Sequence, residues 1–373
     1  MNSMAIFLLI ISLAGLLYAI LILSFSYGWD HLKPFKIQSE KLPSISIVVA
    51  VRNEGRNIPS LLESLLRQEY PHDLCEIILV DDHSEDETVK RINELDQENR
   101  VDLINMTGDD SGKKKALQLG IQKATGALIA TTDADCVPGN RWLKTLASAY
   151  QSGKYRMISG PVAVNKPKGF LGMFQALELL SLVASGAGAI AIGKPVMCNG
   201  ANLAFDREAF FLVEAYQGNE HIPGGDDLFL MEKIKKKYSS QAITFLKDKE
   251  AIVLTKGTTG IKDFFNQRIR WVAKSPAYRD SFLILTALTV LAFNLFILFA
   301  FIAAFFDKVF LIAGLTLFVL KSLVDIVLLW KICSFAGQQF LTRYFIFFQI
   351  IYIPFTAVMG IIGNIIGYKW KGR

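Results

Sequence analysis

The stretch IATTDADCVPGN, residues 129–140, is an apolar run that ends in two aspartates one residue apart. Aliphatic and β-branched residues lead into it, and Pro138 and Gly139 follow, so the pattern predicts a buried strand that runs into a loop. Side chains two apart on a strand share a face, so Asp133 and Asp135 are expected to lie side by side. Their mutual repulsion costs energy unless a cation lies between them. The stretch therefore raises the question of whether a cation binds at the end of this strand.

Segments with the pattern of strands and segments with the pattern of helices alternate along the middle of the chain. The strand candidates are SISIVVAV (44–51), EIILVDD (76–82), VDLINM (101–106) and ALIATTDAD (127–135). The helix candidates are a segment that opens between Asn57 and Ser60 and runs to about Gln68, and residues 86–97 and 113–124. This alternation predicts an α/β fold in which helices cover both faces of a mainly parallel sheet. Ligands bind to such sheets at the carboxyl ends of the strands.

Polar residues follow three of these strand candidates. They are Asn53 with Glu54, Asp81 with Asp82, and Asp133 with Asp135. Their position favours a ligand site, although turn and helix-cap roles are an alternative for the residues of DDHSED. A solvated helix face is likewise an alternative for the lysines of GKKKA. The G-x-G-x-x-A match at residues 186–191 does not follow a strand, so it is rejected as a dinucleotide fingerprint.

Long apolar runs stand on both sides of the charged middle region. Hydrophobic residues make up 52% of the chain. Residues 6–23 are apolar enough to cross a bilayer. No basic residue precedes them and no clear cleavage site follows, so we interpret residues 1–27 as a retained membrane anchor, with a signal peptide as the alternative. Residues 282–368 contain about three further candidate spans, of which the last is interrupted by Pro354 and glycines and has a re-entrant alternative.

The basic residues that follow the first anchor predict its orientation. Lys33, Lys36 and Lys41 place the middle region in the cytosol by the positive-inside rule. The basic tail KWKGR would then lie outside after three further spans, so the topology of that end stays open. Four cysteines without a C-x-x-C pair fit a reduced compartment. We therefore expect a multi-pass protein of the plasma membrane, or inner membrane, with a cytosolic middle domain.

Seven motifs occur in an order and rough spacing that resemble those of the membrane-bound family 2 glycosyltransferases. They are VAVRNEGRNI, LVDDHSEDET, GKKKALQLG, TTDADCVP, CNGANLAFDREAF, GGDDLFL and QRIRW. The resemblance covers about residues 42–274, and cellulose, hyaluronan and ceramide glucosyl synthases are relatives. It implies a Rossmann-like GT-A domain at residues 42–257 and an amphipathic interfacial helix at residues 258–278, followed by the membrane region 282–368.

The resemblance also assigns residues to the donor site. Asp82 is similar to the acid that holds the nucleotide base, with Glu54 near it. Lys113 matches a donor-binding lysine. Asp133 and Asp135 form the D-x-D pair that binds Mg²⁺ or Mn²⁺ together with the diphosphate of the donor, and Asp133 is also counted among the donor-binding residues.

The remaining motif residues are assigned in the same way. Asp227 is similar to the catalytic base, and Asp226 stands where the family more often has Glu. A simple helix-cap role is the alternative for either aspartate. Gln267, Arg270 and Trp271 match the Q-x-x-R-W motif that closes over the donor, and the surrounding basic helix suits a membrane interface.

These features together predict an inverting glycosyltransferase. The donor is expected to be a nucleotide sugar, UDP-linked by analogy, and the acceptor a membrane lipid hydroxyl or phosphate. A processive polysaccharide synthase is the second reading, and a catalytically silent nucleotide-binding membrane scaffold is an alternative of another class. The lipid bilayer is an expected partner and nucleic acid is not. Within one apolar span, Lys321 and Asp325 lie four apart, which predicts a mutually satisfied ion pair or, alternatively, a path for a lipid head group.

Overall fold

The computed structural model describes residues 3–36, 41–108, 110–219, 222 and 224–362. The predicted tail KWKGR and the end of the last apolar run lie outside these residues. The chain divides into two compact units. We call residues Met1–Asp30, Pro167–Ile192 and Gly257–Arg373 the helical unit, and residues His31–Lys166 and Gly193–Lys256 the sheet unit.

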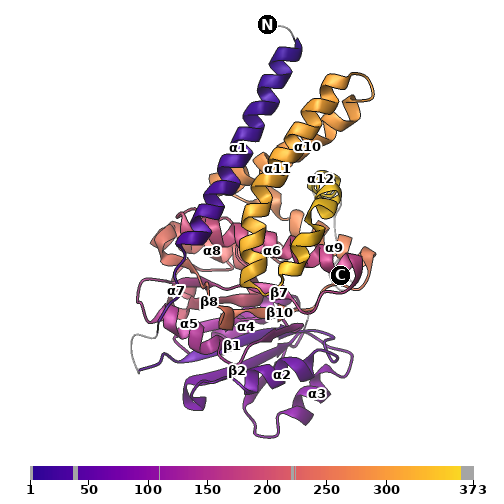
Figure 1. Cartoon of the computed structure of the whole chain (residues 1–373). Coiled ribbons are helices and arrows are strands. Elements are labelled where there is room, and N and C mark those ends of the chain that lie inside the picture. Colours follow the sequence, from indigo (N-terminus) through magenta and orange to yellow (C-terminus); the bar gives the residue numbers. More distant parts are fainter. Residues whose placement is uncertain (1–2, 37–40, 109, 220–221, 223, 363–373) are drawn as a thin grey trace. The chain divides into compact units, whose positions relative to one another are not determined.

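The sheet unit is built on a seven-stranded sheet in the order β3-β2-β1-β4-β8-β6-β9. Figure 1 labels β1, β2 and β8 of this sheet. Its strands are β1 (Ile45–Val51), β2 (Cys75–Asp81), β3 (Val101–Asn105), β4 (Leu128–Thr131), β6 (Met157–Ser159), β8 (Leu203–Asp206) and β9 (Ile243–Phe245). Strand β8 is antiparallel to both β4 and β6, whereas the other neighbouring pairs are parallel. A second sheet joins β5 (Cys136–Pro138), β10 (Val253–Thr255) and β7 (Val162–Val164). The expected α/β class with a mainly parallel sheet is confirmed.

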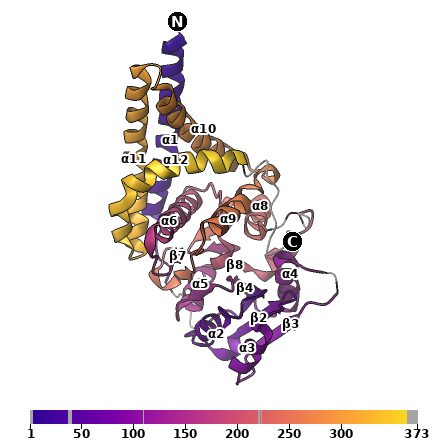
Figure 2. The same ribbon diagram turned by 90° about the vertical axis from the view of Figure 1, so that its right-hand side faces the viewer.

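Amphipathic helices cover this sheet. They are α2 (Ile58–Leu66), α3 (Thr88–Leu95), α4 (Lys113–Lys123), α5 (Trp142–Tyr150), α7 (Arg207–Leu212) and α8 (Asp226–Tyr238). Helices α2 and α3 lie side by side in both views (Figure 2). Helix α4 packs so closely on β1 and β2 that a side chain at Gly120 would collide with Val48 and Val80. Helix α2 begins at Ile58, within the predicted start between Asn57 and Ser60, and Asn57 at its N-cap makes no side-chain cap bond.

The helical unit consists of α1 (Ser3–His31), α6 (Gly169–Ala191), α9 (Ile261–Val272), α10 (Ser281–Ala303), α11 (Lys308–Phe335) and α12 (Phe345–Ile362). Short 3-10 turns complete the two units at His72–Leu74, Gly200–Asn202, Ser240–Ala242, Lys249–Ala251, Ser275–Ala277 and Gln339–Tyr344. Helices α10 and α11 form a hairpin (Figure 2). Helix α12 continues through Pro354.

Five segments among the described residues are long and apolar enough to cross a membrane. They are Ile6–His31, Gly169–Ala191, Ser281–Ala303, Lys308–Phe335 and Gln339–Ile361. The sequence predicted four, because Gly169–Ala191 was read as part of the 42–257 domain. This segment clusters instead with the other apolar helices, and 61% of it is buried. The functional domain bounds given above stay a prediction.

Helices α1 and α6 approach each other through glycines. A Cβ atom at Gly188 would lie 2.2 Å from the carbonyl oxygen of Phe25, and one at Gly28 would lie 2.3 Å from the carbonyl oxygen of Gly188. Only glycine leaves room for backbones at this distance. Gly188 belongs to the G-x-G-x-x-A match rejected above, and its role in the structure is helix packing.

A buried polar network links α1, α11 and α12. Lys321 is fully buried and pairs with Asp325, one turn further along α11. The hydroxyl of Tyr18 donates to Asp325 Oδ1 at 2.6 Å, and Gln349 Nε2 donates to Asp325 Oδ2 at 2.8 Å. Lys321 Nζ donates to the Tyr18 hydroxyl at 3.0 Å. Both charges are therefore satisfied inside the helical unit, which favours the ion-pair reading of these two residues.

Candidate active site

The loops that follow β1 and β2 hold each other in place. The Asn53 N–H donates to Ser84 Oγ at 2.9 Å, and Asn53 Oδ1 accepts the Glu85 N–H at 2.8 Å. The Glu54 N–H donates to Thr88 Oγ1 at 2.8 Å. Asn53 has a positive φ of 51°, which asparagine tolerates better than most residues. These bonds fix Glu54 at the carboxyl edge of the sheet, where the sequence predicted it.

The two acids at the end of β2 have different surroundings. Asp82 is 1% exposed, accepts the Gly112 N–H at 2.9 Å, and faces the guanidinium of Arg52 at 3.4 Å. Asp81 accepts the Ser84 N–H through Oδ2 at 3.0 Å. Its buried Oδ1 has no hydrogen-bond partner within the described part of the chain. A buried acceptor without a donor is costly, so Asp81, to which the resemblance assigned no role, is a candidate for ligand binding alongside Asp82.

Asp133 and Asp135 lie in the turn between β4 and β5. Strand β4 ends at Thr131, so the prediction that the aspartates belong to the strand itself is wrong. The Cys136 N–H donates to the Asp133 carbonyl at 3.0 Å and closes the turn. Ligand atoms of Asp133, Asp135 and Cys136 lie within 4.8 Å of one another. The two carboxylates therefore lie close together as predicted, but because of a turn and not because they share one face of a strand.

The chemistry of this turn suits a hard divalent cation. Burial and the neighbouring Asp133 carboxylate raise the pKa of Asp135 to about 6. Burial also raises the pKa of the Cys136 thiol, which makes this group a poorer ligand than the two carboxylates. Two carboxylates remain as ligands, and oxygen ligands are those that Mg²⁺ prefers and that Mn²⁺ accepts. A bound cation would also remove the repulsion that raises the pKa of Asp135.

Lys113 stands among the acids of the site. It begins α4, directly after Gly112, and its Nζ donates to Asp133 Oδ1 at 2.6 Å. Burial alone would lower the lysine pKa, but the carboxylates of Asp133, Asp226 and Asp227 outweigh it and raise that pKa. The ammonium group of Lys113 therefore interacts electrostatically with all three carboxylates. Residues from the turn between β4 and β5, from α4 and from α8 therefore lie near one another.

Asp226 and Asp227 form the first turn of α8. The N-cap is Gly225, with a φ of 72°, so neither aspartate occupies the cap position. Asp227 accepts the Gly200 N–H through Oδ2 at 3.0 Å and the Leu228 N–H through Oδ1 at 2.8 Å. Asp226 is buried, whereas Asp227 is half-buried. The two backbone donors fix the carboxylate of Asp227 while part of it reaches the surface.

Lys114 belongs to the GKKKA run, for which a solvated helix face was the alternative, but it is only 7% exposed. Its Nζ donates to the Asn219 carbonyl at 2.6 Å, to Asn219 Oδ1 at 3.0 Å and to the Ile222 carbonyl at 2.9 Å. These bonds tie the start of α4 to the segment that leads into α8. A charge run does not reveal which lysine turns inward, so this tether could not be read from the sequence.

The Q-x-x-R-W residues lie on α9, in the helical unit. Gln267, Arg270 and Trp271 are all half-buried. The buried residues of α9 are Phe264 and Arg268, one turn apart. Helix α9 therefore has the amphipathic pattern expected for residues 258–278.

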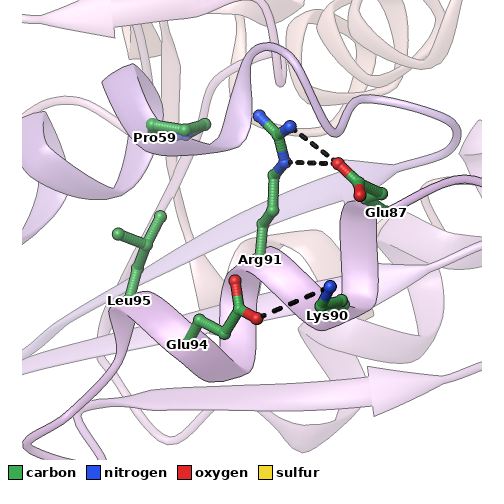
Figure 3. A pocket seen from close by; sticks show the side chains of 6 residues that line it. All are labelled: Pro59, Glu87, Lys90, Arg91, Glu94 and Leu95. Carbon is green, nitrogen blue, oxygen red and sulfur yellow. Dashed lines mark hydrogen bonds and ion pairs between the residues drawn. The ribbon is translucent and has the colours of Figure 1, made fainter.

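A separate hollow of about 380 Å³ lies between α2 and α3 (Figure 3). Its charged side chains pair with one another, since Arg91 bonds Glu87 at 2.7 Å and Lys90 lies 3.9 Å from Glu94. Because these charges are already compensated, the hollow has no feature that selects a ligand.

Comparison with known proteins gives consistent matches in this region. The family model for Glycosyl transferase family 2 matches residues 46–210. Glycosyltransferase AglE of Haloferax volcanii is 29% identical over 128 residues, which are 34% of this chain and 42% of that protein. The undecaprenyl-phosphate 4-deoxy-4-formamido-L-arabinose transferase of Proteus mirabilis is 36% identical over 104 residues, 26% of this chain and 30% of that protein. The chain thus spans less than half the length of these curated relatives.

A solved structure matches over nearly the whole chain. The mannosyltransferase PcManGT from Pyrobaculum calidifontis, in complex with GDP-Man and Mn²⁺, aligns with a TM-score of 0.59 and 19% identity. The alignment covers 96% of this chain and 98% of that one. The likeness shows that the two proteins share a fold.

Proposed function

We propose that this chain, a member of glycosyltransferase family 2 through residues 46–210, transfers a sugar from a nucleotide-sugar donor to an acceptor held at a membrane. The expected GT-A fold is the one it shares with the aligned mannosyltransferase. The observation that carries the proposal is the contact of Lys113 with Asp133 at 2.6 Å, with Asp226 and Asp227 near enough for their charges to raise the pKa of Lys113. It supports a single site in which Asp133 is the proposed metal ligand, Lys113 a proposed donor-binding residue and Asp227 the proposed base.

The donor side of the proposal rests on opposite charges. Asp133 and Asp135 are the proposed ligands of a Mg²⁺ or Mn²⁺ ion, which when bound would neutralise charge on the donor diphosphate. Lys113 adds a positive charge next to the same ligands. Glu54 and Asp82 are the proposed contacts of the nucleotide, and the buried Oδ1 of Asp81 adds an acceptor that a base N–H would satisfy.

The acceptor side rests on Asp227. Its carboxylate would take the proton of the acceptor hydroxyl while the hydroxyl oxygen bonds to the anomeric carbon and the bond from that carbon to the diphosphate breaks. Attack from the face opposite the leaving group inverts the anomeric centre. The Gly200 and Leu228 N–H groups keep the carboxylate oriented before the acceptor arrives. Gln267, Arg270 and Trp271 are proposed as further donor-binding residues.

A lipid acceptor is the first choice for this site. The five apolar segments support an acceptor that is itself membrane-bound. The Proteus mirabilis relative is named as a transferase for undecaprenyl phosphate. A lipid phosphate of this kind is one of the two acceptor forms expected for this chain. The lysines at positions 33, 36 and 41 support a cytosolic sheet unit in the plasma or inner membrane. Processive polymer synthesis and a silent nucleotide-binding scaffold are the competing functions.

One experiment separates these functions. The purified protein is incubated with Mn²⁺, total lipid extract and each of a panel of radiolabelled UDP- and GDP-sugars. Label that becomes organic-soluble supports a lipid acceptor, whereas label in a water-soluble polymer supports a processive synthase. Nucleotide binding without any transfer, across the whole panel, would refute the proposed enzyme and favour the scaffold.

A further inference from the structure

Helix α9, which carries Gln267, Arg270 and Trp271, is attached to α6 through its two buried residues. The rings of Phe264 and Phe174 lie 5.9 Å apart, centroid to centroid, in an edge-on contact. One turn further along both helices, Arg268 pairs with Glu178. Phe264 also packs against Phe355 of α12, with 5.4 Å between the ring centroids. The ion pair adds a directional contact that fixes the side chain of Arg268.

The pair has the geometry of a strong, desolvated interaction. Glu178 is 8% exposed and Arg268 is 5% exposed. Arg268 Nε donates to Glu178 Oε1 at 3.1 Å and to Oε2 at 3.0 Å, and Nη2 donates to Oε2 as well. Such forked contacts fix direction as well as distance. Removing the acid would leave the guanidinium buried without its counter-charge, which is strongly unfavourable.

The same guanidinium contacts two side chains of the Q-x-x-R-W motif. Its Cζ lies 4.3 Å from the centroid of the Trp271 ring and 4.4 Å from that of Phe264, so it sits against both rings. Its Nη1 donates to Gln267 Oε1. Arg268 occupies a variable position of the motif, yet it is the group against which Trp271 and Gln267 rest. An interaction that fixes the guanidinium of Arg268 therefore also fixes the side chains of Trp271 and Gln267.

We propose that Glu178, on α6, is a positioning residue for the Q-x-x-R-W side chains and acts through Arg268. The inference rests on the proposed role of those side chains in binding the donor. Glu178 itself is not expected to contact substrate. The Glu178 carboxylate fixes the Arg268 guanidinium, and the guanidinium fixes the orientation of the Trp271 ring and of the Gln267 side chain. The donor then binds to side chains that are already oriented.

Two variants and a matched control test the proposal in the full-length protein. Glu178→Gln removes the counter-charge. Glu178→Gln with Arg268→Met removes the buried charge as well, so the stability lost in the first variant should return. Asp30→Asn is the control, because it breaks the 2.6 Å pair with Lys331 in the same unit without touching α9. Each is assayed for thermal unfolding, for donor kcat/KM with the sugar nucleotide that the wild type transfers, and for Trp271 emission.

The expected result is a loss of at least tenfold in donor kcat/KM in both Glu178 variants, and a change of less than twofold in the control. The emission of Trp271, taken as the difference from a Trp271→Phe background, should shift to the red when the guanidinium leaves its ring. If the double variant regains both the unfolding temperature and the kcat/KM of the wild type, Glu178 is only structural and the proposal is wrong. A wild type without transfer overturns the proposed function instead, and the emission shift still decides whether Glu178 orients Trp271.

Discussion

Replacing Asp227 with asparagine tests the assignment of the base most directly. The carboxylate accepts two backbone N–H groups, from Gly200 and from Leu228. An asparagine side chain has one carbonyl oxygen, so it keeps one of these bonds and turns its NH₂ toward the other donor. Loss of one charge-assisted bond at a half-buried site costs about 1.5 kcal/mol of the free energy of unfolding. The variant is therefore expected to fold.

The expected loss of activity is much larger than this loss of stability. A positioned general base contributes roughly 10²- to 10⁴-fold to the rate of such a transfer. At about 1.36 kcal/mol per tenfold, Asp227→Asn should raise the activation free energy by about 2.7–5.4 kcal/mol. Donor affinity should change little, because the proposed metal and phosphate ligands Asp133, Asp135 and Lys113 are intact. A purely structural role would give a small fall in unfolding temperature and an almost normal rate.

The assay compares transfer rates and donor binding in the same preparation. Transfer is followed as organic-soluble radiolabel, and nucleotide affinity by calorimetry with Mn²⁺. Asp226→Asn serves as the control and should lose much less activity, since Asp226 is the more buried of the two acids. A near wild-type transfer rate in a folded Asp227→Asn protein would refute the assignment of the base.

Three further outcomes follow from the structure. Chelator should abolish transfer and Mg²⁺ or Mn²⁺ should restore it, and full activity in excess chelator or in Asp135→Ala would rule out the metal site. Each single change, Lys321→Asp or Asp325→Lys, should lower expression, and the double variant that exchanges the two charges should restore it with unchanged acceptor kinetics. If the double variant is expressed but has lost affinity for the acceptor, the two residues line a path for the lipid head group instead. Gly188→Ala should lower thermal stability by about 1–3 kcal/mol, because its new methyl group meets the backbone of α1. Gly172→Ala, on the same helix but with no neighbour nearer than 3.7 Å, should have little effect, and equal losses in the two variants would contradict the packing role.

The order of strands and helices could be predicted because local patterns determine it. Apolar runs such as residues 44–51 and 76–82 form the strands β1 and β2, and the acids that follow them reach the carboxyl edge as expected. Parallel pairing then brings the strand ends together without further information. The proximity of Asp133 and Asp135 also followed from spacing, although a turn rather than a strand provides it.

Features that depend on contacts between distant segments could not be predicted. Helix α6 contains Glu178 and a run of small residues, so its sequence resembles part of a mixed domain more than a span. Its place is determined by partners far along the chain, through the glycine contact with α1 and the ion pair with Arg268. The inward turn of Lys114 has the same cause, because its three acceptors lie more than 100 residues away.

The interleaving of the two units along the chain has a consequence for biogenesis and for protein engineering. Strand β4 emerges from the ribosome before α6, but its partner β8 emerges after it. The sheet therefore cannot close until α6 has been made, and α6 cannot complete its packing until α9–α12 follow. Such long-range pairing slows folding and leaves apolar surface exposed during synthesis. A water-soluble sheet unit consequently requires an internal excision of residues 167–192 with a linker in their place, since trimming the two ends of the chain leaves α6 behind.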